Sequence, residues 1–123
     1  MQGEIERFKG RPIKSTGDGF LATFDGPARA IHCALEASRK IHRLGIEVRS
    51  ALHTGEVELI GEDVGGIAVH TAARVLEQAG PNEVWTSRTV KDLVAGSAFR
   101  FRDRGSYRLQ GVSDDWSLFS VEQ

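Results

Sequence analysis

Hydrophobic residues in this chain recur at two different spacings, which predict helices in some segments and strands in others. Between residues 26 and 44, apolar side chains at positions 31, 35 and 41 approximate helical spacing, and a glycine follows at the expected stop. A second helix is predicted to end near residue 79, where a Gly-Pro pair interrupts it. Its buried stripe is expected to consist of four residues, namely Ala68, Ala72, Val75 and Ala79.

Shorter apolar runs bounded by turn residues predict strands. Two of them, at 11–16 and 19–24, flank Gly17-Asp18-Gly19, which is a hairpin signal. Residues 3–9 are expected to be the end of a helix, the segment 61–66 a loop, and Asp25 and Ser87 the N-caps of helices. The remaining strands are expected at 46–53, 57–60, 83–86, 99–104, 106–110 and 116–121. Helices that alternate with hairpins indicate an α+β fold, with helices packed on a mainly antiparallel sheet.

Composition and charge narrow the classes of function. The 123 residues suit a single domain, 1–123, and the formal net charge of −1 argues against a protein held to nucleic acid by bulk electrostatics. We expect no membrane partner, because no apolar stretch approaches the length of a bilayer span. The single cysteine, Cys33, cannot form an internal disulfide and is typical of a reducing compartment, so we expect a cytoplasmic protein.

The hairpin signal at 17–19 carries the first candidate for chemistry. Asp18 lies between two glycines, so its carboxylate is exposed at a sharp turn and could bind a hard cation such as Mg²⁺. The structural alternative is a turn aspartate that bonds its own backbone. Lys14, four residues earlier, is by itself equally well explained as a solvated charge on a strand edge.

A second group of candidates lies at the start of the second long helix. His70 and Arg74 are four residues apart and therefore share one helix face, beside the predicted buried stripe. Asp63 precedes them in the predicted loop. Taken singly, the three are as readily explained as a surface pair and an ordinary loop acid.

Together these residues resemble one family. The run from Lys14 to Phe20, the segment 49–56 with its His-Thr-Gly, and the segment 63–74 are similar in order and spacing to class III nucleotidyl cyclase catalytic domains of the bacterial, actinobacterial-like type. The resemblance implies a ferredoxin-like core of βαββαβ type. It also implies a homodimer with shared active sites that converts ATP to 3′,5′-cyclic AMP and pyrophosphate with two metal ions, Mg²⁺ or Mn²⁺.

The same resemblance assigns a role to each candidate. Asp18 matches one of two metal-binding aspartates, Lys14 and Asp63 match the pair that reads the base, and Arg74 matches the arginine that stabilises the transition state. His70 stands where many members carry an asparagine that orients the ribose. The base-reading pair is chemically sensible for adenine, because lysine only donates and an ionised aspartate only accepts hydrogen bonds.

Two departures from the family pattern stand out. The initial strand and its metal-binding aspartate precede anything in this sequence, so we expect an N-terminally truncated domain with impaired activity and a gap between the strands at 20–24 and 46–53. The lysine that holds the triphosphate in the last hairpin corresponds to Gln110, and Arg108 is the candidate substitute.

Two other classes of function compete with a cyclase. A degenerate, non-catalytic nucleotide-binding or dimerisation module fits the absent aspartate, but retention of Lys14, Asp18, Asp63 and Arg74 opposes it. A ferredoxin-like RNA-binding sheet would use exposed aromatics on its strands and a basic face, and the near-neutral charge opposes that reading.

Overall fold

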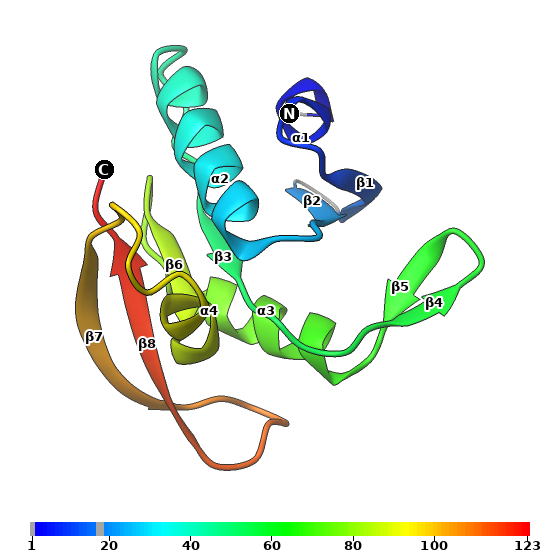
Figure 1. The fold of residues 1–123 in the computed structure, drawn as a ribbon, viewed down its shortest axis with the longest axis vertical. Coiled ribbons are helices and arrows are strands. Elements are labelled where there is room, and N and C mark those ends of the chain that lie inside the picture. The colour runs from blue at the N-terminus through cyan, green and yellow to red at the C-terminus, as the bar shows by residue number, and fades with distance from the viewer. Residues whose placement is uncertain (1, 17–18) are drawn as a thin grey trace.

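The computed structural model of the chain describes residues 2–16 and 19–123. Four helices and eight strands are assigned within these ranges (Figure 1). In chain order they are α1 (Gln2–Arg7), β1 (Arg11–Thr16), β2 (Gly19–Thr23), α2 (Pro27–His42), β3 (Ser50–Leu52), β4 (Glu58–Ile60), β5 (Asp63–Gly65), α3 (Ile67–Gln78), β6 (Val84–Ser87), α4 (Arg88–Leu93), β7 (Phe101–Arg108) and β8 (Asp115–Val121).

A four-stranded sheet in the order β3-β6-β8-β7 forms the centre of the fold. Strand β3 runs parallel to β6, whereas β6 and β7 both pair antiparallel with β8. Because β3 and β6 are parallel, the chain must cross over between them, and α3 lies in that connection. The predicted α+β class with a mainly antiparallel sheet is confirmed.

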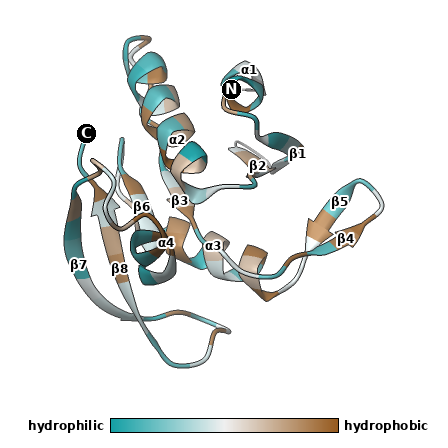
Figure 2. Cartoon of the chain, viewed as in Figure 1, coloured by the Kyte–Doolittle hydropathy of each residue, from teal (hydrophilic) through white to brown (hydrophobic). Residues whose placement is uncertain are grey.

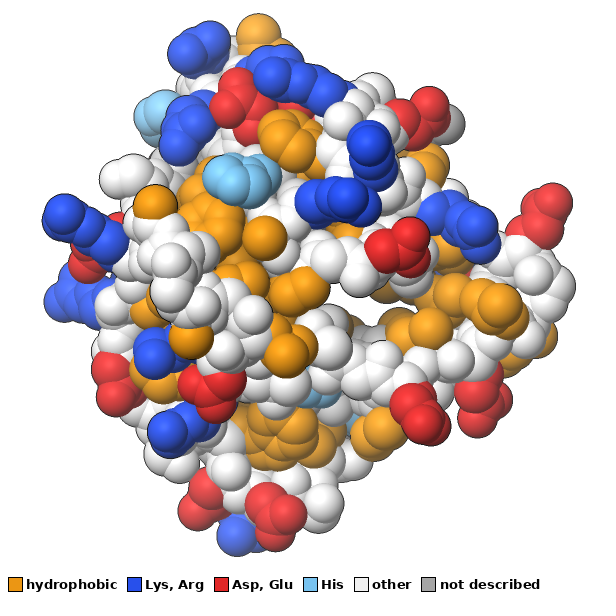
Figure 3. Space-filling view, viewed as in Figure 1, with side chains coloured by type: hydrophobic (Ala, Val, Ile, Leu, Met, Phe, Trp, Pro, Cys, Tyr) orange, Lys and Arg blue, Asp and Glu red, His pale blue; other side chains and the backbone are white. Residues whose placement is uncertain are grey.

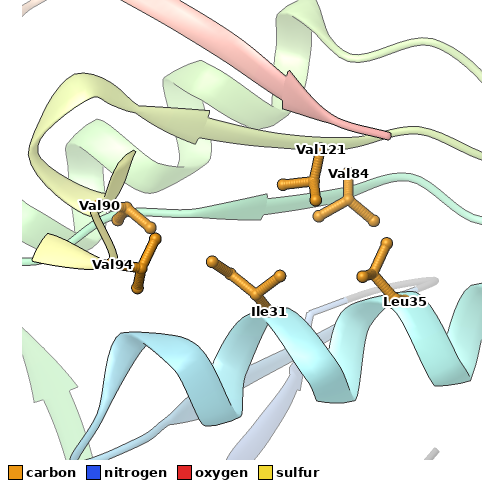
Figure 4. Packing of buried hydrophobic residues seen from close by; sticks show 6 residues of the cluster. All are labelled: Ile31, Leu35, Val84, Val90, Val94 and Val121. Atoms are coloured by element: carbon orange, nitrogen blue, oxygen red, sulfur yellow. The ribbon is translucent and has the colours of Figure 1, made fainter. Parts of the chain in front are cut away.

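The sheet is covered on both faces. Val84 and Trp85 are adjacent on β6 and therefore point to opposite faces. On one face the buried cluster combines α2 and α4 with the strands and consists of Ile31, Leu35, Val84, Val90, Val94 and Val121 (Figure 4). On the other face the cluster is built around α3 and consists of Val75, Ala79, Trp85, Leu109 and Leu118. Helices α2 and α4 thus cover one face, and α3 covers the other.

Two hairpins lie outside the central sheet. Strand β1 pairs only with β2, and β4 only with β5, so each hairpin forms a two-stranded sheet of its own. Strand β3 pairs with β6 on one edge, and within residues 2–16 and 19–123 no strand pairs with its other edge. The strands at 19–23 and 50–52 therefore belong to different sheets, with free backbone edges of the kind that can accept another strand.

The structure corrects three local predictions. The segments 99–104 and 106–110 form one strand, β7, because Gly105 adopts φ +97° at a shift in register and its N–H bonds the Asp103 carboxylate at 2.7 Å. Such a bulge lets a strand continue past a residue that would otherwise break it. The predicted loop 61–66 contains β5, and Gly26 rather than Asp25 is the N-cap of α2.

The β4–β5 hairpin projects from the body of the molecule and carries hydrophobic residues on β4 (Figures 1 and 2). Leu59 and Ile60 are 72% and 60% exposed, and Ile67 at the start of α3 is exposed as well. Hydrophobic side chains are visible along this arm in Figure 3. Clusters of exposed apolar residues are typical of surfaces that meet a partner. None of the helices in the described ranges is both long and apolar enough to cross a bilayer.

The packing of α2 against the sheet yields a stability prediction. Ile31 is completely buried between α2 and β6, so Ile31→Ala should lower the free energy of unfolding by roughly 2–5 kcal/mol. The matched control is Ile46→Ala, because Ile46 is 55% exposed and should change stability by no more than about 0.5 kcal/mol. Urea denaturation followed by circular dichroism measures both, and equal losses would contradict the assigned core.

Candidate functional site

Lys14 and Asp63 are brought into direct contact although 49 residues separate them in the sequence. The ammonium Nζ of Lys14 donates to Oδ2 of Asp63 at 2.9 Å. Lys14 lies on β1 and Asp63 begins β5, so this ion pair joins the β1–β2 hairpin to the β4–β5 hairpin. Both side chains are 46% exposed, which leaves their outer edges open to a ligand.

The Asp63 carboxylate is oriented by a second hydrogen bond. Its Oδ1 accepts the backbone N–H of Val64 at 2.7 Å, while Oδ2 accepts from Lys14. The hydrogen bond from Lys14 and the one from the Val64 backbone together hold the pKa of Asp63 below its ordinary value. The carboxylate is therefore ionised at neutral pH and can only accept hydrogen bonds, beside an ammonium that can only donate. A hydrogen-bond donor and an acceptor thus stand side by side at this edge.

Arg74 lies on α3 and combines an exposed end with a buried stem. Its Nη1 donates to the carboxylate of Glu77, one helical turn further along. Its Nε is buried and has no hydrogen-bond partner among the residues that the structure describes. Glu77 was not singled out from the sequence, although its spacing of three residues from Arg74 is a signal for such a pair. Arg74 is thus held on a rigid helix by a partner that an anionic ligand could replace.

His70 lies one helical turn before Arg74 and contacts the turn between β7 and β8. Its Nε2 is 3.2 Å from the backbone carbonyl oxygen of Gln110. The sequence placed His70 as a ribose-orienting residue, and the structure adds this bond to the last hairpin. Gln110 is exposed at that turn, whereas Arg108 is 82% exposed and pairs with Asp115 across the hairpin.

The predicted metal ligand, Asp18, lies outside the described residues. Among residues 2–16 and 19–123, no group of three or more His, Cys, Asp or Glu side chains is arranged so that it could hold a metal ion. The described residues therefore do not form a metal site by themselves.

His53, from the His-Thr-Gly run, has a packing role that the sequence did not indicate. Its Nδ1 lies 2.7 Å from Oγ of Ser87, and its ring packs edgewise on Trp116. Burial lowers the pKa of His53, which favours the neutral ring. Ser87 is the N-cap of α4 as predicted, but its hydroxyl bonds His53 instead of a backbone N–H of that helix.

Comparison with solved structures reveals close similarity to one group of enzymes. An adenylate/guanylate cyclase/hydrolase from Silicibacter pomeroyi superposes with a TM-score of 0.88 and 26% identity, over 98% of this chain and 76% of that chain. The catalytic core of a rhodopsin-guanylyl cyclase with converted specificity, solved with ATPalphaS, superposes with a TM-score of 0.85 and 20% identity, over 98% of this chain and 75% of that chain. An adenylate cyclase from Trypanosoma brucei in its monomeric state superposes with a TM-score of 0.80 and 18% identity, over 98% of this chain and 73% of that chain.

Sequence comparison finds relatives of undefined role. Uncharacterized proteins of Mycobacterium bovis and Mycobacterium tuberculosis are 37% identical over 87 residues, which is 70% of this chain. The chain matches only 30% of the length of these relatives. No protein-family model matches the sequence.

The Lys14–Asp63 contact leads to a prediction about pH. Lys14→Met should raise the pKa of Asp63 toward its ordinary value, because the hydrogen bond that is the largest cause of the depression is lost while the Val64 N–H remains. A depressed carboxyl pKa stabilises the fold above the pKa of the unfolded chain, and this contribution disappears as the pH falls through the folded value. The stability difference between wild type and Lys14→Met should therefore be present at neutral pH and shrink in acid.

Carbon-13 NMR titration of the Asp63 carboxyl measures the pKa directly. Lys9→Met, which removes the same charge from the residue before Gly10, is the control and should leave the Asp63 titration in place. An Asp63 pKa that does not move in Lys14→Met would mean that the ion pair does not form in solution.

Proposed function

We propose that this chain, which has the fold of the catalytic domains of class III adenylate and guanylate cyclases, is a nucleotidyl cyclase domain of adenylate type. Residues 1–123 would form one such domain, which binds ATP and converts it to 3′,5′-cyclic AMP and pyrophosphate. The observation that carries the adenylate assignment is the direct contact between Lys14 and Asp63. Hydrogen bonds from this pair to the base would make the domain selective for ATP over GTP.

The chemistry of the pair suits adenine. The Watson–Crick edge of adenine offers an acceptor at N1 beside a donor at its 6-amino group. Lys14 would donate to N1 and Asp63 would accept from the amino group, because their atoms already stand 2.9 Å apart with the carboxylate ionised. Guanine presents the opposite pattern and would leave both protein groups unpaired, which is costly.

Arg74 would act on the phosphate chain. The ribose 3′-hydroxyl oxygen forms a bond to the α-phosphorus, the bond to the pyrophosphate oxygen breaks, and the hydroxyl proton passes to solvent. Negative charge grows on the α-phosphate oxygens during this exchange. The guanidinium of Arg74, held on α3, would leave Glu77 and donate to those oxygens, and its planar fork matches phosphate geometry. His70 lies on the same helix face, one turn before Arg74.

Asp18 is the one residue to which this proposal gives the role of a ligand for divalent metal ions. The Asp18 carboxylate would supply one ligand for Mg²⁺ or Mn²⁺, with the substrate phosphates and water as further ligands. The described residues offer no other group of metal ligands, so we assign no step of the reaction to an ion.

The proposed assembly is a homodimer with shared active sites. The projecting β4–β5 hairpin exposes Leu59 and Ile60, and Ile60 is the cross-strand neighbour of Asp63, so a surface suited to a partner adjoins the proposed base-reading pair. A second chain docked on this arm would lie next to the nucleotide. We propose a cytoplasmic location, and neither nucleic acid nor membrane as a partner.

A second candidate is a nucleotide-binding or dimerisation module without turnover. The separation of β2 and β3 into different sheets favours it, because a site spread over unjoined sheets is less rigidly held. The two candidates share the base-reading pair and differ in whether cyclic AMP is formed.

The adenylate assignment is tested by reversing the pair. Wild type should bind ATP more tightly than GTP, and Lys14→Glu combined with Asp63→Lys should reverse this preference, by roughly 10- to 100-fold in the ratio of affinities. Calorimetric titration with Mg²⁺ or Mn²⁺ present measures binding, and a chromatographic assay for cyclic AMP separates a cyclase from a module without turnover.

The matched control for this reversal is Arg88→Asp combined with Asp92→Arg. It inverts another exposed ion pair, on α4, and should leave the ATP preference unchanged. Equal affinity of wild type for ATP and GTP, or a reversed pair that still prefers ATP, would refute base reading by Lys14 and Asp63.

Arg74 provides a separate test of the catalytic role. In an active form of the domain, Arg74→Ala should lower kcat by roughly 10²–10³ and change ATP affinity far less, because its charge is needed most in the transition state. Arg74→Lys should recover only part of the loss. Arg88→Ala, which removes another helix arginine paired with a carboxylate, is the control. A raised KM with unchanged kcat would instead make Arg74 a residue that binds the ground state.

A further inference from the structure

The contact between His70 and the β7–β8 turn joins two segments that are 40 residues apart. A backbone carbonyl can only accept a hydrogen bond, so Nε2 of His70 must carry the proton and donate to the Gln110 oxygen. The neutral ring with its proton on Nε2 and the doubly protonated ring can both make this bond. Of the two ring nitrogens, only Nδ1 remains available to a ligand.

The residue that follows Gln110 is a glycine, which leaves space for the His70 ring. Gly111 adopts φ +76°, and a β-carbon at this position would lie 2.8 Å from Nε2 of His70. Any side chain here would therefore push the imidazole away from the Gln110 carbonyl. The ring of His70 thus occupies the space that a side chain at position 111 would need.

The turn itself is anchored on both sides of this contact. Leu109 is buried in the α3-side core together with Val75, and the N–H of Val112 donates to the Leu109 carbonyl at 3.1 Å. Beyond the turn, the indole N–H of Trp116 donates to the carbonyl of Ser113 at 2.9 Å. His70 thus fixes the middle of a turn whose ends are already held, which leaves Gln110 little freedom relative to α3.

We propose that His70 is a positioning residue that holds the tip of the β7–β8 hairpin against α3, next to Arg74, so that the two form one rigid surface for the phosphate groups of a nucleotide. His70 and Arg74 are neighbours on one face of α3, so the hydrogen bond from His70 places Gln110 on the side of α3 that carries Arg74. The exposed amide of Gln110 then adds hydrogen-bond donors beside that positive charge. This inference rests on the proposed function for the identity of the ligand.

Two substitutions at position 70 separate this role from orientation of the ribose. The amide nitrogen of glutamine reaches about as far as Nε2, whereas that of asparagine reaches only as far as Nδ1. His70→Gln should therefore keep the bond to Gln110, and His70→Asn should lose it. A histidine that merely replaces a ribose-orienting asparagine would give the opposite order, with asparagine tolerated.

A pair of glycine substitutions tests the same contact from the other side. Gly111→Ala and Gly105→Ala place a β-carbon at φ +76° and +97° respectively, so both carry the strain of a left-handed residue. Only Gly111→Ala also collides with His70, because nothing lies within 4 Å of a β-carbon at Gly105. Gly105→Ala is thus the matched control on the same hairpin.

The readout is calorimetric binding of inorganic tripolyphosphate, ATP and adenosine to the full chain with Mg²⁺ present. His70→Asn and Gly111→Ala should weaken tripolyphosphate and ATP binding about fivefold to tenfold and leave adenosine binding unchanged. His70→Gln and Gly105→Ala should match wild type. Amide resonances of residues 109–113 should shift in the two impaired variants, which tests whether the turn has moved while the rest of the fold is intact.

Three results would overturn the inference. Retained phosphate binding in His70→Asn, together with its loss in His70→Gln, would mean that His70 orients the ribose instead. Equal behaviour of Gly111→Ala and Gly105→Ala would mean that the close approach to His70 has no consequence for binding. Wild type that binds ATP but not more tightly than adenosine would refute the phosphate surface, whereas wild type that binds no nucleotide at all would refute the proposed function and this role with it.

Discussion

Strand β6 is buried along its whole length, and the packing on its two faces fixes where the helices lie. Val84 faces the cluster formed with α2 and α4, and its neighbour Trp85 faces the cluster formed with α3. Because adjacent strand residues must point in opposite directions, four residues are enough to hold helices on both sides of the sheet. The position of α3, and with it the face that carries His70 and Arg74, is a consequence of this burial.

The candidate site depends on a second link, between the two hairpins that lie outside the central sheet. Lys14 and Asp63 connect β1 to β5 by an ion pair whose carboxylate is also held by the Val64 N–H. Asp63 lies four residues before the start of α3, so the same segment that carries the acid continues into the helix. Asp63, His70 and Arg74 thereby lie in one continuous stretch of chain, and the ion pair joins Lys14 to it.

The candidate residues that lie within 2–16 and 19–123 share one feature. Lys14 is paired with Asp63, Arg74 with Glu77, and His70 with the Gln110 carbonyl, so each has an intramolecular partner. Exposed ion pairs contribute little stability, so a phosphate or a base can replace or join such partners at small cost. Arg74 gains most from a new partner, because its buried Nε has no hydrogen-bond acceptor within residues 2–16 and 19–123.

Hydrophobic spacing and turn residues are local signals, so they predicted most of the helices and strands, but they missed β5 and the continuity of β7. The roles of the candidate residues were implied by the resemblance and stay predictions. The pairing of Lys14 with Asp63 was implied by resemblance, and its geometry came only with the structure. Contacts such as His70 with Gln110, His53 with Ser87 and the bulge at Gly105 were decided by tertiary packing. They join residues brought close by a register shift or by burial on a shared face, and no local pattern of side chains encodes either.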